Sequence, residues 1–573
     1  MSFPHPKEFQ TVPRRKTEVT IRDGYKRIKD VYIPTRDGSE LCGNVFLPTN
    51  TSDEKFPVLF SFGPYGKDIH FAEFGKPKTD MYANMAKAIV PLGPDACFET
   101  PDPIVWCKEH GYALLRVDVR GSGGSPGVLD PFGIGRTQLI NDDSEGHDCY
   151  DVIEWAGTQE WSNGKVGMCG ISYLGMACYW AAMHQPPHLS AIVPYEALAD
   201  KYADTTRQGG LWHSGFQKHW FNNIIMPSQY GKLEGLSEEQ LAKQRFDFTQ
   251  LETNWIWRSE GPWPVLDRTR DLAKIKVPML TAGNWMDSEV HLPGNPTSYE
   301  RASSEWKFLE MHTGNHLAAY YDPDQIKRQL TFLDYFLKGK TNNGLEGSPR
   351  IDLLIRKGTD DFYRTESSWP PKDSVQTPLY LAPNESLSFE QYKASSEDDV
   401  LSYAGFTGAN FFQTEPLKEK LEILGFPHLD LTVSTDAKDM DIFVYFYVID
   451  PNGKKLVFRG NHDEPAVSFL RSWFRLSHRT LSSKSTPERP VLEQMKPAPI
   501  EANKWYDVKV PVVCTSMIIE PGQRLAIAIR ANDEEEIIPP MRHIGPSRTE
   551  DLLAGTNRIK FGGKLILPVV KRP

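Results

Sequence analysis

The most constraining feature of the sequence is a stretch around Ser172 that predicts a strand, a sharp turn and a helix in immediate succession. Lys165 to Cys169 is a short apolar run that follows turn residues and predicts a buried strand. Met176 to Met183 is apolar or aromatic without a helix breaker and predicts a helix. The turn between them, Gly170-Ile-Ser-Tyr-Leu-Gly175, predicts strained backbone at Ser172, with small neighbours that let strand and helix pass closely.

This strand–turn–helix context is the one in which a serine becomes an exposed nucleophile. We expect Ser172 Oγ to project into a cleft, with the backbone N–H of Tyr173 facing a developing oxyanion. The usual motif has glycine two residues after the serine, whereas this chain has Leu174 there and Gly175 one position later. Because a Gly-x-Ser triplet is common by chance, the turn alone leaves an ordinary structural serine as an equal alternative.

Length and composition limit the kind of protein and its partners. At 573 residues the chain is too long for one hydrophobic core. Its formal net charge of −10 argues against a nucleic-acid or anionic-membrane partner. The 7 cysteines are scattered without a CxxC pair, which favours buried thiols over a disulfide framework. No apolar stretch approaches the roughly 18 residues of a membrane span, and no signal peptide is visible. We therefore expect a cytoplasmic protein.

The order of the predicted elements divides the chain into parts. Alternating strands and helices predict a parallel α/β sheet, interrupted by a segment rich in Trp, Gln, Asn and charge that has helical spacing. After a linker at 340–349 the pattern becomes all-β, beginning with the strand Ile351–Arg356, and predicts a β-sandwich or jelly roll. The predicted parts are an N-terminal arm at 1–30, an α/β core at 31–197 and 271–340, a helical cap at 198–270, and a β-sandwich at 350–573.

A nucleophilic serine needs a base and a group that orients the base. In α/β-hydrolases the order along the chain is Ser, acid, His, each placed just after a strand. Asp287 follows the strand predicted at 277–283, and His312 and His316 follow the next one. Taken singly, Asp287 could be a capping carboxylate and His316 a packing histidine. Their order and their positions after strands favour a triad of Ser172, Asp287 and His316.

Two further site features can be weighed from the sequence. The pair His312 and His316 could indicate a metal, but Gly314 and Asn315 break a helix there and no third ligand is evident. We expect neither a metal nor a cofactor. The loop Gly63-Pro-Tyr65 follows a strand, and the hydroxyl of Tyr65 could donate to an oxyanion. The alternative is a tyrosine that packs on the neighbouring loop.

Several motifs together resemble one family. Gly-x-Ser-Tyr-x-Gly in place of Gly-x-Ser-x-Gly is similar to the cocaine esterase and X-Pro dipeptidyl-peptidase (CocE/NonD) family of serine hydrolases. The loop Val117–Ser125 and the approach to the turn at Trp161–Gly167 resemble that family too. So do Trp473–Arg479 and Pro521–Leu525 near the C-terminus. The resemblance covers most of the chain.

The resemblance implies an α/β-hydrolase core with an inserted helical cap and a C-terminal jelly roll. It implies that Ser172 is the nucleophile, Asp287 the acid and His316 the base, with Tyr65 and the Tyr173 N–H as oxyanion donors. The histidine loop lacks the usual Gly-Pro-Trp-x-His lead, so His312 remains a rival base, although His316 lies closer to the family register.

The implied mechanism is two-step acyl transfer through a covalent acyl-enzyme, which hydrolyses a small-molecule ester, amide or lactone. Trp212, Phe216 and Trp285 are candidates for substrate binding, and for the cap aromatics the alternative is a cap core. Carboxylates such as Asp204 and Glu196 could bind an amine, but solvated helix faces are favoured. An acyltransferase or lactone-forming enzyme and a non-catalytic ligand-binding protein remain alternatives, and a homo-oligomer is possible.

Overall fold

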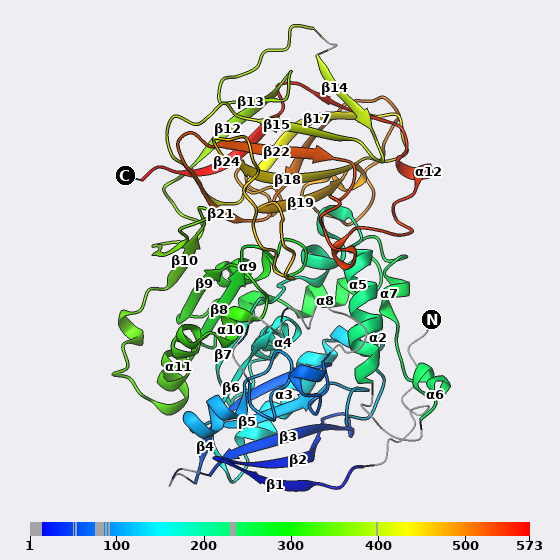
Figure 1. The fold of residues 1–573 in the computed structure, drawn as a ribbon. Helices are drawn as coiled ribbons and strands as arrows, with labels where there is room; N and C mark the ends of the chain where they lie inside the picture. The colour runs from blue at the N-terminus through cyan, green and yellow to red at the C-terminus, as the bar shows by residue number, and fades with distance from the viewer. Residues whose placement is uncertain are drawn as a thin grey trace.

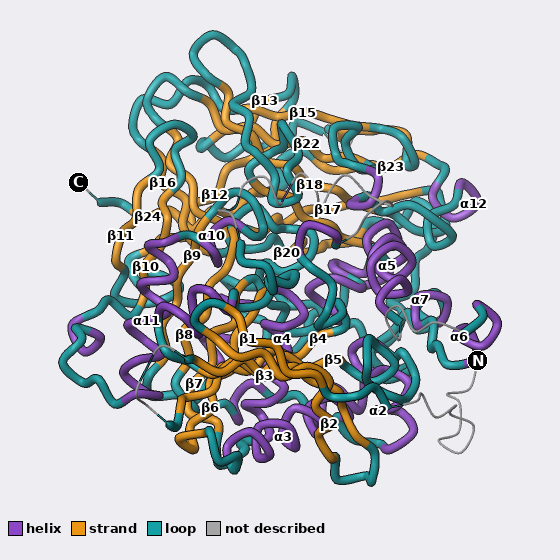
Figure 2. The backbone as a smooth tube through the Cα atoms, turned by 60° about the horizontal axis from the view of Figure 1, so that its bottom comes forward, coloured by secondary structure: helices purple, strands orange, loops and turns teal. Residues whose placement is uncertain are grey.

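The computed structural model describes residues 14–49, 51, 54–74, 85, 89, 92–229, 236–396 and 399–572. Figure 1 shows two domains, one above the other. We call residues 14–365 the core domain and residues 374–572 the C-terminal domain. The core domain mixes strands and helices, whereas the C-terminal domain is built almost wholly of strands and loops (Figure 2).

The core domain is organised around an 11-stranded sheet with the order β1-β2-β3-β5-β4-β6-β7-β8-β9-β10-β11. Neighbouring strands from β5 to β10 pair in parallel, as the sequence predicts. The strands are β1 (Glu18–Arg22), β2 (Tyr25–Pro34), β3 (Glu40–Pro48), β4 (Phe56–Gly63), β5 (Ala113–Asp118), β6 (Ser162–Ile171), β7 (Leu189–Tyr195), β8 (Met279–Asn284), β9 (Lys307–His312), β10 (Ile351–Ile355) and β11 (Phe362–Thr365). The central strands β4 to β7 are almost entirely buried, as is typical of a parallel sheet covered on both faces.

Helices connect these strands and cover the sheet. Those of the core are η2 (Phe71–Glu73), η3 (Ile104–Glu109), η4 (Pro131–Gly133), α2 (Ile134–Ile140), α3 (Ser144–Gly157), α4 (Ser172–His184), α9 (Gly294–Arg301), α10 (Ala318–Tyr321), α11 (Pro323–Lys338) and η10 (Leu345–Gly347). Asp322 precedes α11, and its carboxylate accepts hydrogen bonds from the backbone N–H groups of Asp324 and Gln325. Gly339, in the left-handed conformation, follows the helix. α11 is thus capped at both ends.

Two predicted boundaries are wrong. The predicted arm at 1–30 includes β1 and most of β2, which form an antiparallel hairpin at the edge of the core sheet. The β-branched run Val19-Thr-Ile21 is a strand-forming signal that the charged neighbours obscured. Residues 1–13 lie outside the described part of the chain. The strand at Ile351–Ile355 was expected to open the β-sandwich, but it pairs in parallel with β9 and extends the core sheet.

The predicted cap contains short helices and, in its described residues, no named strand. They are η5 (Tyr202–Thr206), η6 (Gln208–Gly210), α5 (Ser214–Trp220), η7 (Phe221–Ile225), η8 (Met226–Ser228), α6 (Glu238–Lys243), α7 (Phe248–Leu251), α8 (Trp263–Thr269) and η9 (Leu272–Lys274). In Figure 1 the labelled cap helices α5, α7 and α8 lie beside the region where the two domains meet. The cap therefore contributes to the same region as the ends of the core strands.

The C-terminal domain contains a 13-stranded sheet in which all pairs are antiparallel except β13 with β15. Its elements are β12 (Ser374–Ala382), β13 (Ser386–Ser388), β14 (Val400–Ala404), β15 (Ala409–Gln413), β16 (Leu421–Gly425), β17 (His428–Thr435), β18 (Asp441–Ile449), β19 (Leu470–Arg475), η11 (Leu476–His478), β20 (Tyr506–Pro511), β21 (Thr515–Ile519), β22 (Arg524–Arg530), η12 (Pro539–Met541), α12 (Glu550–Leu553), β23 (Thr556–Lys560) and β24 (Lys564–Val570). The predicted α/β core with a C-terminal all-β jelly-roll domain is confirmed.

One hydrophobic cluster runs through both domains, so their interface is continuous with the two cores. Trp285 of the core packs on Trp369, with ring centroids 5.8 Å apart, near the start of the C-terminal domain. Among the described residues, no helix combines the length and apolar character that crossing a membrane requires.

Candidate active site

The turn at Ser172 has the strained geometry that the sequence predicts. β6 ends at Ile171 and α4 begins at Ser172, whose φ is 55°. A serine in the left-handed region carries a conformational cost, and such residues cluster at functional sites. Because Ser172 is the first residue of α4, the backbone N–H of Tyr173 belongs to the unpaired N-terminal turn of that helix.

Three glycines make room for this turn. A Cβ atom on Gly170 would lie 2.4 Å from Cβ of Leu174, and one on Gly63 would lie 2.6 Å from Leu174 Cδ1. A Cβ on Gly175 would lie 2.7 Å from the carbonyl oxygen of Tyr195, at the end of β7. Gly63 and Gly170 therefore leave room for the side chain of Leu174, which stands where the usual motif has glycine. Gly175 allows α4 to approach the end of β7 closely.

Ser172 is hydrogen-bonded to a histidine that the sequence analysis did not select. Its Oγ lies 2.9 Å from Nε2 of His291, and Nδ1 of the same ring is hydrogen-bonded to Oδ2 of Asp287. All three side chains are buried. Although burial opposes it, the adjacent imidazole of His291 lowers the pKa of Asp287 below its usual range, which keeps this carboxyl ionised. Serine, imidazole and carboxylate thus form a continuous chain.

The expected base, His316, requires correction. Its Nδ1 lies 2.6 Å from Oε2 of Glu196 and its Nε2 lies 3.2 Å from Oε1 of Glu99, so both ring nitrogens face carboxylates rather than Ser172. The rival, His312, lies between Glu310 and Glu196. Neither ring has the hydrogen-bond position of a base for Ser172.

The physical reason is the path of the loop that follows β8. After Asp287 the chain curls so that the N–H of Leu292 donates to the Asp287 carbonyl at 3.0 Å. This turn brings His291, four residues after Asp287, into contact with the carboxylate and places its ring beside Ser172. In the sequence, the signal for this contact is the i, i+4 spacing of Asp287 and His291, which lies before the next strand.

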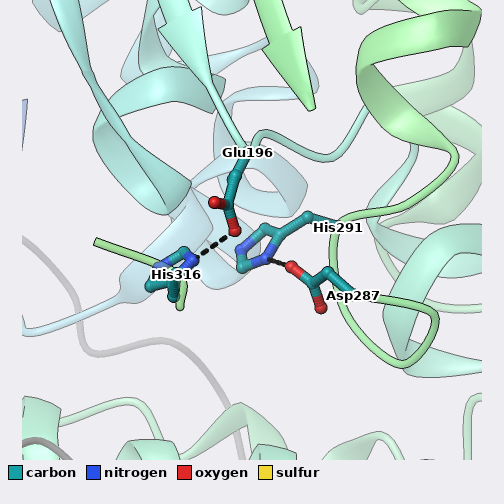
Figure 3. Close-up of side chains that lie close together, drawn as sticks. All are labelled: Glu196, Asp287, His291 and His316. Carbon is teal, nitrogen blue, oxygen red and sulfur yellow. Dashed lines mark hydrogen bonds and ion pairs between the residues drawn. The ribbon is translucent and has the colours of Figure 1, made fainter. Parts of the chain in front are cut away.

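His316 lies directly behind the triad. Its ring is stacked on that of His291, with centroids 5.0 Å apart and an interplanar angle of 9°. Figure 3 shows the two rings side by side, each tied to its own carboxylate. Glu196 follows β7 and is 1% exposed, so the predicted solvated helix face is wrong for this residue.

The four residues of Figure 3 also bear on metal binding. Potential ligand atoms of Glu196, Asp287, His291 and His316 all lie within 4.8 Å of one another. Nitrogen lone pairs lie in the plane of an imidazole, so rings that are stacked nearly parallel direct theirs along parallel planes rather than at one point. The arrangement fits a hydrogen-bonded network better than a coordination sphere.

Both expected oxyanion donors lie close to the turn. The ring of Tyr65, in the loop after β4, meets the ring of Tyr173 edge-on with centroids 6.4 Å apart. The Tyr65 hydroxyl accepts a hydrogen bond from Nε1 of Trp220 at 3.3 Å. The Tyr173 side chain points elsewhere, since its hydroxyl donates to Glu145 at 2.6 Å. Only the backbone N–H of Tyr173 is therefore a candidate donor from that residue.

The predicted substrate-binding aromatics have other roles. Trp212 is fully buried and its indole N–H donates to Glu252 at 3.3 Å. Trp285 is equally buried and donates to the carbonyl of Leu354 at 2.8 Å. Phe216 is half-buried and stacks on His213. The two tryptophans have no exposed surface for a substrate, and we correct their assignment to packing.

A cavity of about 630 Å³ lies beside α4, between cap and C-terminal domain. Met176 and Trp180 line it from the helix, Tyr202 and Trp263 from the cap, and Trp473 from β19. Ser172 and His291 do not line this cavity; of its lining residues in α4, Met176 lies nearest to Ser172, one helical turn away.

Comparison with known proteins gives consistent results. Residues 37–318 match the family described as X-Pro dipeptidyl-peptidase (S15 family), and residues 343–565 match the X-Pro dipeptidyl-peptidase C-terminal non-catalytic domain. Cocaine esterase from Rhodococcus sp. (strain MB1 Bresler) is 23% identical over 96% of this chain and 100% of its own length. Xaa-Pro dipeptidyl-peptidase from Ligilactobacillus salivarius is 23% identical over 74% of this chain and 60% of its own. A CocE/NonD family hydrolase from Staphylococcus aureus superposes with a TM-score of 0.82 at 27% identity, covering 100% of this chain and 99% of its own.

Proposed function

Since the chain belongs to the X-Pro dipeptidyl-peptidase (S15) family of serine hydrolases, we propose that it hydrolyses an ester, or a related acyl bond, of a small organic substrate through an acyl-enzyme on Ser172. The observation that supports this most directly is the hydrogen-bonded chain from Ser172 Oγ through His291 to Asp287. The buried, unpaired state of all 7 cysteines supports a reducing, cytoplasmic location.

In this mechanism His291 takes the proton of Ser172 as the hydroxyl attacks the acyl carbon. Asp287 fixes the orientation of the imidazole and stabilises the positive charge that it acquires. The tetrahedral oxyanion accepts hydrogen bonds from the Tyr173 N–H and the Tyr65 hydroxyl. His291 then returns the proton to the leaving group and later activates the water that releases the acid.

A fluorophosphonate probe tests the nucleophile. We expect covalent labelling at Ser172 and its loss in Ser172→Ala, while Ser483→Ala, which changes an exposed serine of the C-terminal domain, remains labelled. Turnover of an activated ester such as p-nitrophenyl acetate should fall by about 10³-fold or more in Ser172→Ala and in His291→Ala. Full activity of His291→Ala at matched folding would contradict the proposed base.

A substrate panel then separates the alternatives. Ester, lactone and Xaa-Pro peptide substrates, tested with and without an added alcohol acceptor, distinguish hydrolysis from acyl transfer by their products. A protein that binds such ligands but neither reacts with the probe nor turns them over would be a binding protein, and the proposal would be wrong.

A further inference from the structure

Behind the triad, five buried side chains form an alternating series of carboxylates and imidazoles. Glu310 is hydrogen-bonded to His312 at 2.8 Å and His312 to Glu196 at 2.9 Å. Glu196 is hydrogen-bonded to His316 at 2.6 Å, and His316 to Glu99 at 3.2 Å. Each of these five residues is at most 4% exposed. Such a network is costly to bury unless its charges and hydrogen bonds are satisfied.

Glu196 is the centre of this series. Its carboxylate accepts hydrogen bonds from four side chains: His312, His316, Asn284 at 3.2 Å and Asn461 at 2.9 Å. Although burial opposes it, His316 and His312 lower its pKa, so the group is ionised. Glu196 has a φ of 39°, a conformation unusual for a glutamate.

His316 is held as a cation. Nδ1 of His316 faces Glu196 and Nε2 faces Glu99, so a ring that carries a proton on each nitrogen can donate to both carboxylates. Burial alone would lower the pKa of His316, but Glu196 and Glu99 raise it well above its usual value. The proton on each nitrogen leaves His316 without the lone pair that a catalytic base needs.

The C-terminal domain completes this arrangement. The side-chain amide of Asn461 donates to Glu196, and its backbone carbonyl accepts the N–H of His316 at 3.0 Å. The next residue, His462, stacks on His316 with centroids 6.1 Å apart and an interplanar angle of 20°. His316 is thus stacked with His291 of the core and with His462, which lies between β18 and β19.

We propose that Glu196 and Asn461 fix His316 as a permanent cation against the ring of His291, and that His316 is a positioning residue which opposes protonation of the catalytic imidazole. This inference rests on the proposed function, because it gives His291 the role of base. The stacked cation counteracts the attraction of Asp287 for a proton on His291. The acid limb of the pH profile of kcat/KM should therefore lie at lower pH with His316 present than without its charge.

Other titratable groups face the same site and contribute to the electrostatic potential at His291. Glu196 follows β7, Glu99 precedes η3, Asp287 follows β8, and His312 ends β9. His462 reaches the site from the C-terminal domain, and burial lowers its pKa. His316 is the group whose positive charge lies in a ring stacked on His291.

The test compares the pH dependence of kcat/KM in His316→Gln with that of the parent enzyme, using an activated ester. Glutamine removes the charge but keeps a hydrogen-bonding group. We expect the acid limb to move to higher pH by about one unit, so that activity at the foot of the limb falls about tenfold. KM should change little, and fluorophosphonate should still label Ser172 at alkaline pH.

Two further variants sharpen the result. In Glu196→Gln/His316→Gln both opposite charges are removed, so the acid limb should return toward its parental position. His188→Gln disrupts another imidazole–carboxylate pair, His188 with Glu154, away from the triad, and should leave the profile unchanged. If His316→Gln does not fold, Asn461→Ala, which removes one hydrogen bond to Glu196, should still shift the limb upward by a smaller amount.

Three outcomes would overturn the inference. A profile that keeps its parental position in folded His316→Gln means that His316 only packs. A loss of labelling and turnover at every pH, equal to that of His291→Ala, means that His316 is itself the base. If Asn461→Ala is the only variant that folds, an acid limb at the parental pH in that variant would also overturn the inference. Unreduced activity in Ser172→Ala would instead contradict the proposed function, so the two failures are distinguishable.

Discussion

At the scale of single residues, the active-site proposal depends on which groups meet at Ser172. Of the residues proposed for the site, Ser172 and Asp287 are joined through His291, and the Tyr173 N–H lies in the first turn of α4. The hydroxyl of Tyr65 is the remaining candidate donor. It accepts from Trp220, and a hydroxyl that accepts one hydrogen bond can still donate its own proton to a second group.

If Tyr65 donates to the oxyanion, Tyr65→Phe should lower kcat by roughly 10²-fold with little change in KM, because the contact exists only in the transition state. Steady-state kinetics with an activated ester measure the effect. Tyr150→Phe, which changes a tyrosine in the middle of α3, is the matched control and should keep parental kcat. A Tyr65→Phe enzyme with unchanged kcat would remove Tyr65 from the mechanism.

His312 predicts a pH dependence of stability. Burial opposes it, but Glu310 and Glu196 raise the pKa of His312 to about 10, above its usual value near 6.5. The stabilisation is fully present below about pH 6.5 and is lost as pH rises through about 10. The melting temperature should therefore fall over this range, and less steeply in His312→Gln. Parallel curves for the two proteins would contradict the assignment.

At the scale of secondary-structure elements, the position of α4 against β7 depends on Gly175. A Cβ added there would lie 2.7 Å from the backbone oxygen of Tyr195, which cannot move without disturbing the sheet. Because Ser172 is the first residue of α4, any displacement of the helix moves the nucleophile relative to His291.

Gly175→Ala should therefore destabilise the protein by about 1–3 kcal/mol and reduce kcat. Gly347→Ala is a suitable control, because a Cβ there meets nothing within 4 Å and its φ is not positive. Chemical denaturation and ester kinetics on the two variants measure both effects. Equal stability of Gly175→Ala and the parent would show that the helix adjusts without cost.

The elements also show what the sequence could and could not predict. Apolar runs at 165–169 and 277–283 predicted buried strands correctly because buried parallel strands are continuous hydrophobic segments. The hairpin at the N-terminus was missed because its edge strands alternate apolar and charged residues on an exposed surface. His291 was missed because it lies within an irregular loop, where the ring's direction depends on backbone turns that no periodic pattern records.

At the scale of the whole molecule, Arg356 joins the two domains. It follows β10 and is fully buried, and its guanidinium donates to Ser516 O at 2.9 Å, to Thr515 Oγ1 at 2.7 Å and to Phe469 O at 3.1 Å. Burial lowers the pKa of Arg356 to about 9. Since the hydrophobic core is also continuous across this boundary, we expect the domains to unfold together.

Arg356→Met should leave buried oxygens of the C-terminal domain without their donor and destabilise the protein by about 2–4 kcal/mol. Calorimetry should show one transition for the parent, shifted to lower temperature in the variant. Arg301→Met, which removes a half-exposed surface ion pair with Asp271, should shift it little. Two separate transitions in the parent would mean that the domains are independent.

The three stacked imidazoles also constrain how such a protein can change over evolution. His291 and His316 come from one domain, and His462 with Asn461 from the other. A chimera carrying the C-terminal domain of a distant relative would retain Ser172. It would lose the contacts of Asn461 and His462 with Glu196 and His316, unless the new loop placed an amide and an aromatic ring at the same two positions. The two halves are thus expected to be inherited as a unit.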